Sequence, residues 1–569
     1  MGDARPMDRL SHDLGNLSTS YHNARCGDGV YVELEHNKTG ERFRSLDFCG
    51  GASVACFGNG GENASAEYNR VADATVAQIR KLAYVSHTTY QTNVNFDLSE
   101  LLVRNANRYL VKDEGGTKWR YQDIGGDESS KMSHAIIVNS GSEAAEASIK
   151  AVWQYWGSQG KPNKRRILSR ESSYHGNTLG ALSLGEFPSR QDPYKGLIKP
   201  RTPAAQDSGS RISGADTRRS CLKTKTNEMH DEPLEVEYIK FDRYYPFGDK
   251  LDTESEDEYV GRLMNNLEDQ IKILGADTIA AIWIEPVSGA ALGCQPAGPQ
   301  YLAKLKQLCR RNDIILVYDE VMCGMGRTGS MHAWHHDQAQ LDQARRAMNG
   351  HRHLVKDERA LETVAPDIQM VGKCLAAGIM PAAGMIVNKK IAEGLGPKFI
   401  HSFTYQSHPA VCAAAFATQM EIQRLLEIGH IQKIGERLER EIRHNFSGLS
   451  NVTDIRGRGL FWGVELQHDD GGAWAHEVSA ELAAFGEEDY FVRNDACVRF
   501  YAAPAWRLRR HEGPERKGDH IMLSPAYTLT EKEVVEGVSR IKNVIQRYFD
   551  DSVQISYHRA KEARGAFIA

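Results

Sequence analysis

Lys373 is the residue of this 569-residue chain whose surroundings point most directly to chemistry. It follows an apolar stretch, Ile368–Val371, that we expect to be a buried strand, and a run rich in Ala, Gly and Met comes after it. An unpaired ammonium is costly in such surroundings, so we expect the pKa of Lys373 to be lowered. A lysine with a lowered pKa is suited to Schiff-base chemistry. The alternative is an ordinary lysine that extends from a strand end into solvent.

Two further segments place polar residues directly after apolar stretches. The first of these polar residues is Asp319. A protonated pyridine nitrogen would be a natural partner for its carboxylate, and this pairing makes the pyridine ring an electron sink. In NSGSE, Gly141 permits close backbone approach and Ser142 adds a hydroxyl at a helix start, which is typical of a phosphate-binding helix N-terminus. The alternatives are a helix N-cap at Ser140 or Ser142, and an N-cap or metal ligand at Asp319. No second set of ligands at metal spacing accompanies Asp319, so we expect no metal site.

Three more residues fit the same kind of ligand. Tyr174 and His175 follow another expected strand, where an aromatic ring can stack on a flat heterocycle. Thr404 can donate a hydrogen bond to a phosphate. Each has an ordinary alternative: a core tyrosine, a histidine satisfied within the core, and a threonine that caps a turn.

The elements that must position these residues follow a repeating order of apolar strand, small or polar turn, and helix. The expected strands are Ala135–Val138, Arg166–Leu168, Ile279–Ile284, Ile314–Tyr318 and Ile368–Val371. Such strands predict an α/β fold with a mostly parallel sheet covered by helices on both faces. Ligands of these sheets bind beyond the carboxyl ends of the strands, where the candidate residues fall.

Further elements are expected on either side of this region. Towards the N-terminus they are a hairpin around Val30–Leu34 with a turn at Asn37–Gly40, and helices over Glu67–Ala83 and Leu98–Leu110. Towards the C-terminus they are a helix over Ala410–Ile428, a glycine-rich strand segment at Arg456–Leu466 and an amphipathic helix over Glu531–Phe549. This composition indicates a smaller α+β domain. Four polar stretches, at about 111–133, 203–235, 337–363 and 486–519, are expected to be surface insertions or disordered loops.

The composition argues against several classes of protein. A net charge of -5 gives no electrostatic case for nucleic acid or an anionic membrane as partner. The 10 cysteines include no CxxC pair, which favours a reducing compartment over a disulfide framework or a structural zinc site. The N-terminus has no apolar core of a signal peptide, and no apolar run reaches membrane-spanning length. We therefore expect a cytoplasmic protein.

Eight segments taken together carry a family resemblance. They are IIVNSGSEAAEASIK, SYHGNTLGALSL, IWIEPVSGAALG, YDEVMCGMGRTG, PDIQMVGKCLAAGIMP, HSFTYQSHPAVCAAA, DIRGRGLFWGVEL and GDHIMLSPAYTLTEKEV. The chain resembles the class-III (omega) aminotransferases, which are pyridoxal-phosphate enzymes of fold type I. The resemblance covers about residues 28–550 apart from the polar stretches, and eight motifs in the family's order are very specific.

The resemblance implies a role for each candidate residue. Lys373 matches the lysine that holds the cofactor as a Schiff base, and Asp319 matches the aspartate at the pyridinium nitrogen. The other implied cofactor contacts are the ring-face residue Val321, the stacking Tyr174, His175, Glu285, Gly141 and Ser142 at the phosphate, and Thr404 from the neighbouring subunit. It further implies a homodimer with a shared active site, and pocket-lining roles for the loops Cys49–Ala55 and Ser86–Thr92.

The sequence also departs from the family pattern. Met322 stands where many relatives have a glutamine that contacts the ring oxygen, and Ala145 stands where many have asparagine. Where some relatives place an arginine for the substrate carboxylate, this chain has a polar stretch in which Arg516, beside Lys517, is the nearest candidate.

The expected activity is transfer of an amino group from an amine or amino acid to a keto acid such as pyruvate, by a ping-pong mechanism through Lys373. Two alternatives stay open: another reaction on the same cofactor, such as decarboxylation or elimination, and a non-catalytic binding subunit. The implied domains are an N-terminal segment (1–84) that contributes to the small domain, a large cofactor-binding domain (85–400) and a C-terminal small domain (401–569).

Overall fold

A computed structural model of the protein describes the greater part of the chain. The described residues are 22–36, 39–113, 115–116, 118–198, 200–201, 236–349, 362–467, 478–487, 495–508 and 516–550. The predicted insertion at about 203–235 lies outside the described residues, as does most of the second half of the one at 337–363. Within the described ranges, no helix has both the length and the apolar character needed to cross a membrane.

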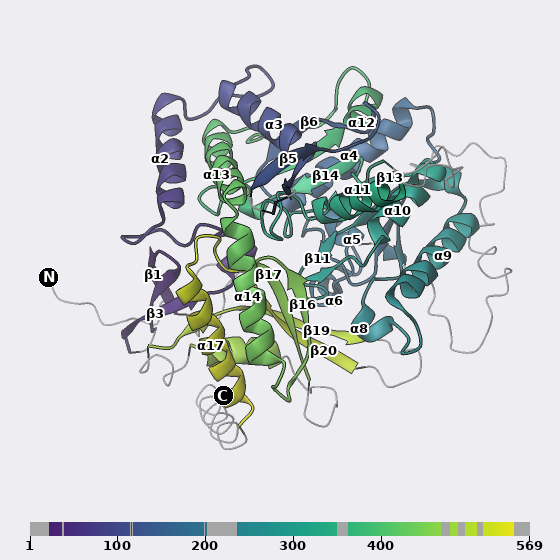
Figure 1. Cartoon of the computed structure of the whole chain (residues 1–569). Helices are drawn as coiled ribbons and strands as arrows, with labels where there is room; N and C mark the ends of the chain where they lie inside the picture. The colour runs from purple at the N-terminus through teal and green to yellow at the C-terminus, as the bar shows by residue number, and fades with distance from the viewer. Residues whose placement is uncertain are drawn as a thin grey trace.

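An eight-stranded sheet forms the centre of the larger part of the molecule (Figure 1). In order across the sheet, the strands are β6 (Met132–Val138), β15 (Ala383–Asn388), β14 (Ile368–Val371), β13 (Ile315–Asp319), β10 (Ile279–Ile284), β7 (Arg166–Arg170), β9 (Glu237–Phe241) and β8 (Pro200–Arg201). All neighbouring pairs from β14 to β8 are parallel, and only β15 runs antiparallel to its neighbours. The predicted mostly parallel sheet is therefore confirmed.

Helices cover both faces of this sheet because alternate strand residues point to opposite sides. The main ones are α4 (Gly141–Ser158), α9 (Glu256–Leu274) and α10 (Tyr301–Arg311). Trp283 and Val317 share a buried cluster with α4, whereas Ile282 and Leu316 share another with α9 and α10. The indole N–H of Trp156 in α4 donates to a carbonyl oxygen of β10 at 2.9 Å. The apolar strands are thus buried on both sides, as their composition predicts.

The N-terminal segment forms a small separate sheet. Its strands are β1 (Asn23–Asp28), β2 (Tyr31–Glu35), β3 (Arg42–Asp47) and β18 (Val498–Arg499). The β2–β3 pair confirms the predicted hairpin, although positions 37 and 38 of its turn lie outside the described residues. Because β18 pairs with β3, this sheet joins the N-terminal segment to a strand from the C-terminal part of the chain.

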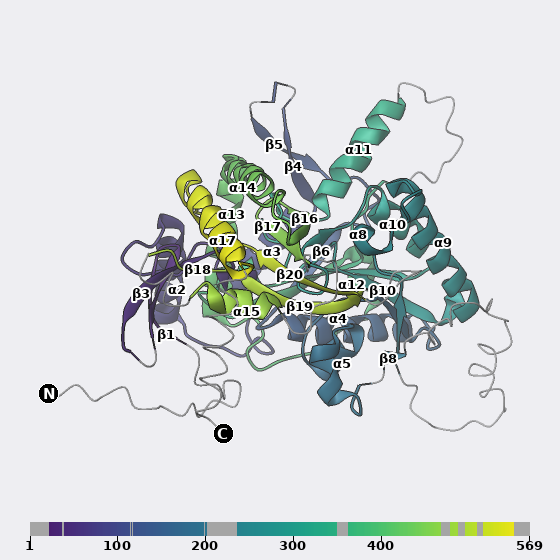
Figure 2. The ribbon, with the colours of Figure 1, turned by 90° about the horizontal axis from the view of Figure 1, so that it is seen from below.

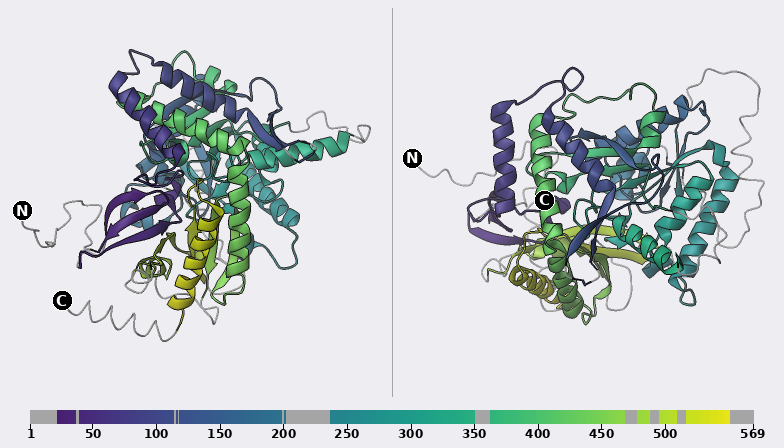
Figure 3. Two further views of the ribbon diagram at one scale, coloured as in Figure 1. Left: turned by 60° about the vertical axis from the view of Figure 1, so that its left-hand side comes forward. Right: turned by 45° about the horizontal axis from the view of Figure 1, so that its top comes forward.

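The C-terminal part forms a second layer of strands and helices. Its sheet contains β16 (Val452–Arg458), β17 (Phe461–Leu466), β20 (Arg516–Leu523) and β19 (Tyr501–Leu508). The helices α13 (Pro409–Glu427), α14 (His430–Phe446) and α17 (Glu531–Tyr548) accompany it. Figure 3 shows α14 and α17 side by side, and their apolar faces share one core with the N-terminal strands. The predicted C-terminal helices are confirmed to within a residue at most ends.

The polar stretches contain more regular structure than the sequence suggested. Residues 108–123 form the hairpin β4 (Arg108–Lys112) and β5 (Trp119–Asp123), and α11 (His335–Asn349) extends into the third stretch. Figure 2 shows this hairpin and α11 projecting from the same side of the molecule. Tyr109 joins them, because its hydroxyl donates to Asp342 at 2.7 Å. Of the two expectations for these stretches, disordered loops were therefore wrong for these parts, and also for β18, β19 and the start of β20 in the fourth stretch.

One predicted helix was placed too far along the chain. The helix expected over Leu98–Leu110 is α3, which covers Asn93–Ala106. Asn107 ends it, because its amide donates to the carbonyl of Met132 and its oxygen accepts from the Met132 N–H, at 2.8 and 2.9 Å. The following residues then enter β4 rather than continuing the helix. The other predicted N-terminal helix is α2 (Ala66–Lys81), which agrees with the expectation.

Candidate active site

A cavity of about 470 Å³ opens at the carboxyl ends of β13 and β14. The residues that line it are Val54, Asn139, Ser140, Gly141, Ser142, Tyr174, His175, Gly176, Glu285, Ala290, Asp319, Val321, Met322, Lys373, Gly378, Met380, Pro381 and Ala382. Eight of the nine residues expected at the site are among them, and the exception is Thr404. Segments more than 300 positions apart in the chain therefore converge on one cavity.

Lys373 stands at the end of β14, in the first position of the short 3-10 turn η5 (Lys373–Leu375). Its φ of 48° is in the left-handed region, which a non-glycine residue adopts only when its surroundings hold it there. Burial lowers the pKa of Lys373, and the nearby Cys374, Asp319 and Glu285 oppose this effect only in part. Arg327 acts in the same direction as burial. The direction of this pKa shift is the one that we expected from the sequence.

Asp319 is held by two contacts at the end of β13. Its Oδ2 lies 2.9 Å from Nδ1 of His175, and its Oδ1 accepts the backbone N–H of Val321 at 3.0 Å. Both side chains are almost fully buried, and Nε2 of His175 has no hydrogen-bond partner among the described residues. These two contacts fix the direction of the Asp319 carboxylate, and His175 is the side chain that orients it.

Glu285 follows β10 and lies in the wall of the same cavity. It accepts the backbone N–H of Gly289 at 3.0 Å and the hydroxyl of Ser288 at 3.3 Å. Burial raises the pKa of Glu285, His175 opposes this, and Asp319 adds to it. Burial and the neighbouring Asp319 carboxylate therefore favour the neutral form of the Glu285 carboxyl group.

The N-terminus of α4 faces the cavity. Ser140 is its N-cap, because its hydroxyl accepts the N–H of Glu143 at 3.2 Å. Ser142 is not the cap; its hydroxyl accepts the N–H of Asn177 at 2.9 Å and joins α4 to the loop that carries Tyr174. A Cβ at Gly141 would lie 2.9 Å from a methyl group of Val321, so only glycine fits here. The other N–H groups of the first turn, those of Gly141 and Ser142, face the cavity side of the helix start and suit an anion.

Tyr174 lines the cavity from this loop. Its ring packs edge-on against Phe187 with centroids 5.9 Å apart, and burial raises the pKa of its hydroxyl. Val321 lies between Gly141 and Gly372, whose absent side chains leave room for it. An aromatic ring and a branched aliphatic side chain therefore both line the cavity, as a flat heterocycle requires.

Thr404 is exposed and does not line the cavity. Its carbonyl oxygen accepts a hydrogen bond from the hydroxyl of Tyr84 at 2.9 Å. Of the two loops expected at the pocket, Cys49–Ala55 supplies Val54, whereas Ser86–Thr92 supplies no lining residue. Arg516 begins β20, and its side chain lies outside the described part of the chain.

Several lining residues were not identified from the sequence. Gly378, Met380, Pro381 and Ala382 belong to the turn between Lys373 and β15. They carry no group that signals chemistry, and only the return of the chain as β15 brings them to the cavity. Among the described residues, no group of three or more His, Cys, Asp or Glu side chains has a geometry that could hold a metal ion.

Comparison with known proteins identifies the family. A model of the family Aminotransferase class-III matches residues 19–235, 215–344 and 358–545. An uncharacterized aminotransferase of Schizosaccharomyces pombe is 30% identical over 521 residues, covering 91% of each chain. The chain therefore belongs to the class-III aminotransferase family and is a pyridoxal-phosphate-dependent aminotransferase.

Other relatives and solved structures agree with this assignment. An aminotransferase of Gibberella zeae is 28% identical over 500 residues, covering 87% of this chain and 79% of its own. Gamma aminobutyrate transaminase 3 of Solanum lycopersicum is 28% identical and covers 72% of this chain and 64% of its own. The fold matches that of the omega transaminase from Pseudomonas jessenii solved with PMP, with a TM-score of 0.67, 22% identity and 92% coverage of both chains.

The residues around the cavity fit pyridoxal phosphate. The cavity has a lysine with a lowered pKa, a fixed carboxylate and the open N-terminus of an 18-residue helix. Gly141 and Ser142 line the cavity at the start of this helix, where a phosphate would bind. The volume of about 470 Å³ lies in the range of small-molecule sites.

Proposed function

We propose that this aminotransferase moves an amino group from an amine or amino acid to a keto acid such as pyruvate, by a ping-pong mechanism centred on Lys373. The observation that carries the proposal is the convergence of Lys373, Asp319 and the N-terminus of α4 on one cavity. These three features match the reactive aldehyde, the ring nitrogen and the phosphate of the cofactor.

The role of each group follows from its chemistry. Pyridoxal phosphate, when bound, supplies a ring that withdraws electrons from the substrate carbon next to the amino group. Nζ of Lys373 would hold the cofactor, and the free amine would accept and return the proton that moves during transfer. Asp319, oriented by His175, holds a proton on the ring nitrogen. Gly141 and Ser142 bind the phosphate with Thr404 of a second copy, while Tyr174, Val321 and Glu285 enclose the ring.

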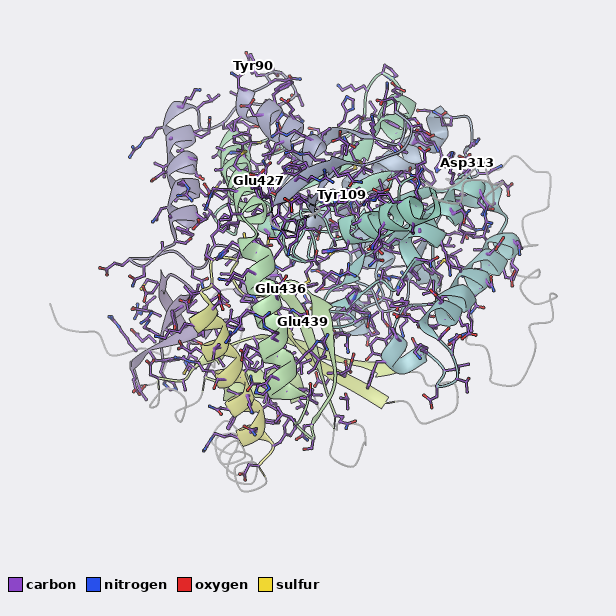
Figure 4. All side chains as sticks on the ribbon, viewed as in Figure 1. Tyr90, Tyr109, Asp313, Glu427, Glu436 and Glu439 are labelled. Atoms are coloured by element: carbon purple, nitrogen blue, oxygen red, sulfur yellow. The ribbon has the colours of Figure 1, made fainter. Side chains whose placement is uncertain are left out.

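We further propose a homodimer. A group of exposed apolar side chains lies on α2, α3 and the segments beside them: Val76, Ile79, Leu82, Tyr84, Tyr90, Phe96, Tyr405 and Met420. Figure 4 shows Tyr90 at the upper edge of the molecule. Exposed apolar patches of this kind mark interfaces. Because Tyr84 and Tyr405 adjoin Thr404, the patch would bring Thr404 to the partner's cavity.

The proposal extends to substrate, compartment and domains. Plant relatives named as gamma aminobutyrate transaminases make gamma-aminobutyrate a first candidate for the amino donor. The composition and the scattered cysteines favour the cytoplasm. The division into residues 1–84, 85–400 and 401–569 assigns the central sheet to the middle domain and the two outer sheets to the ends of the chain.

A donor screen with pyruvate as acceptor tests the function. The purified enzyme loaded with cofactor should form alanine from at least one amine or amino acid, and Lys373→Ala should abolish this turnover. Release of carbon dioxide or ammonia without alanine would favour decarboxylation or elimination instead. A protein that shows no visible absorbance of bound cofactor, after cofactor is added and the excess removed, would be a non-catalytic relative.

A further inference from the structure

Arg327 is a fully buried arginine directly behind the turn that carries Lys373. It is 0% exposed and makes no salt bridge to a carboxylate of the described residues. Its guanidinium instead donates to the carbonyl oxygens of Pro525, Leu460 and Ser53, at 2.6, 3.3 and 3.4 Å, and lies over the ring of Tyr527. A buried charge without a carboxylate partner costs free energy of folding. A functional role for Arg327 would explain why the chain bears this cost.

The same guanidinium contacts the residue next to Lys373. Nη2 of Arg327 lies 3.3 Å from Sγ of Cys374, and that thiol donates to the carbonyl oxygen of Ser53 at 3.0 Å. From the other side, the amide of Gln419 in α13 donates to the carbonyl oxygens of Cys374 and Leu375, at 3.1 and 2.9 Å. The left-handed turn at Lys373 is thus held by two buried side chains, one charged and one neutral.

We propose that Arg327 is a positioning residue for Lys373: it fastens the turn η5 to the N-terminal loop and the C-terminal sheet, and it places a permanent positive charge behind the amine. The inference rests on the proposed role of Lys373 as the lysine that bonds the cofactor. Arg327 does not line the cavity and acts only through its neighbours.

The charge of Arg327 has a definite effect on Lys373. The groups that face Lys373 are Cys374, Asp319 and Glu285, which favour its protonated form, and Arg327, which disfavours it. Arg327 also lowers the pKa of the Cys374 thiol, so the two effects are separated by making the substitutions in a Cys374→Ser background. In that background, removing the guanidinium charge should raise the pKa of Lys373. Since the amine must be neutral to accept a proton, the acid limb of the rate profile should move to higher pH.

The experiment compares the two holding residues, because only one is charged. In the holoenzyme carrying Cys374→Ser, Arg327→Met should move the acid limb of kcat upward by about 0.5–1 pH unit, while Arg327→Lys, which keeps a cation, should leave it near the value of Cys374→Ser alone. Gln419→Leu loosens the same turn without removing a charge, so it should lower kcat several-fold with the limb unmoved. If Arg327→Met does not fold, Arg327→Gln, which keeps donors for the carbonyl oxygens, takes its place.

A second readout does not depend on turnover. The pH at which Lys373 becomes half-reactive towards an amine-directed label, read by mass spectrometry on the cofactor-free protein, should rise in Arg327→Met and stay unchanged in Arg327→Lys and Gln419→Leu. The inference would be overturned if a folded Arg327→Met protein kept both the acid limb of kcat and the labelling midpoint of the parent. It would also be overturned if Gln419→Leu shifted the acid limb as far as Arg327→Met does. Cofactor bonded to a different lysine would contradict the proposed function instead.

Discussion

At the scale of single residues, the site depends on pairs that fix one another. Asp319 would have little direction of its own at the end of a strand, but His175 and the Val321 N–H each take one of its carboxylate oxygens. Lys373 depends on burial for its neutral form and on its neighbours for its backbone conformation. The reactive groups are therefore prepared before any substrate arrives, which is how preorganised sites gain rate.

Asp319→Asn tests this arrangement. The amide keeps the shape of the carboxylate but cannot hold a proton on the ring nitrogen by charge, so we expect kcat to fall by about 100-fold or more. Cofactor should remain bound, because the phosphate contacts of α4 are unaffected. Steady-state kinetics and the absorbance of the purified variant measure both quantities. A variant with near-parental kcat would show that the carboxylate is not needed.

At the scale of elements, the first turn of α4 carries the proposed phosphate site, and its packing explains the glycine. Gly141 has no room for a Cβ beside Val321, whereas Gly157 near the end of the same helix has open space around it. The two glycines of one helix thus have different reasons for being there. Gly141 is needed for packing at the proposed phosphate site, whereas Gly157 affects only the helix propensity of α4.

Gly141→Ala and Gly157→Ala form a matched pair. The first should push the helix start away from Val321 and weaken cofactor affinity by about tenfold or more, in line with a 1–3 kcal/mol overpacking cost. The second should leave affinity unchanged and raise stability by up to about 1 kcal/mol. Cofactor titration and denaturant unfolding measure the two effects. Equal affinity in both variants would mean that the start of α4 does not bind the phosphate.

β9 shows how an element can carry a buried charge. Nζ of Lys240 donates to the hydroxyl of Ser169 at 2.8 Å and to the carbonyl oxygens of Ser183 and Leu184 at the end of α5 (Leu179–Leu184). Burial lowers its pKa to about 7. An unfolded lysine titrates near 10.4, so between about pH 7 and 10 the unfolded state binds more protons than the folded state.

A pH dependence of stability follows. The free energy of unfolding should gain up to about 1.4 kcal/mol per pH unit from Lys240 as the pH rises through this window, and nothing below it. Lys240→Met should lack this contribution. Urea unfolding of both proteins from pH 6 to 9 gives the difference directly. Parallel stability curves would show that the buried amine keeps its ordinary pKa.

At the scale of the whole molecule, one chain does not complete the proposed site, because Thr404 lies outside the cavity. The exposed apolar patch beside it gives the partner a place to bind. Phe96 of α3 is 63% exposed within this patch, and Ile273 of α9 is 58% exposed in another part of the molecule (Figure 1). The two side chains are exposed to a similar extent but lie in different parts of the molecule, so Ile273 serves as a control for Phe96.

Phe96→Asp should dissociate the dimer and remove most activity, since a charge at a buried contact costs several kcal/mol. Ile273→Asp should change neither property. Sedimentation at several protein concentrations, with activity measured on the same samples, distinguishes the two outcomes. A fully active monomer of either variant would contradict the shared active site and the role of Thr404 in it.

The sequence predicted the site better than it predicted the periphery. Strands such as Ile279–Ile284 are apolar throughout, so their ends could be located and the residues after them assigned to one edge of the sheet. β15 and β9 were missed because glycine interrupts the first and a lysine the second, and their burial depends on neighbours remote in the chain. The contacts of Arg327 were missed for the same reason, since its partners belong to separate segments.

The central claim concerns which lysine bonds the cofactor. Borohydride reduction of the loaded enzyme fixes the cofactor to the lysine that holds it, and mass spectrometry of the digested protein then locates it. The account predicts that the label is on the peptide containing Lys373 and nowhere else. A label on another lysine, or none after reduction of a protein saturated with cofactor, would contradict it.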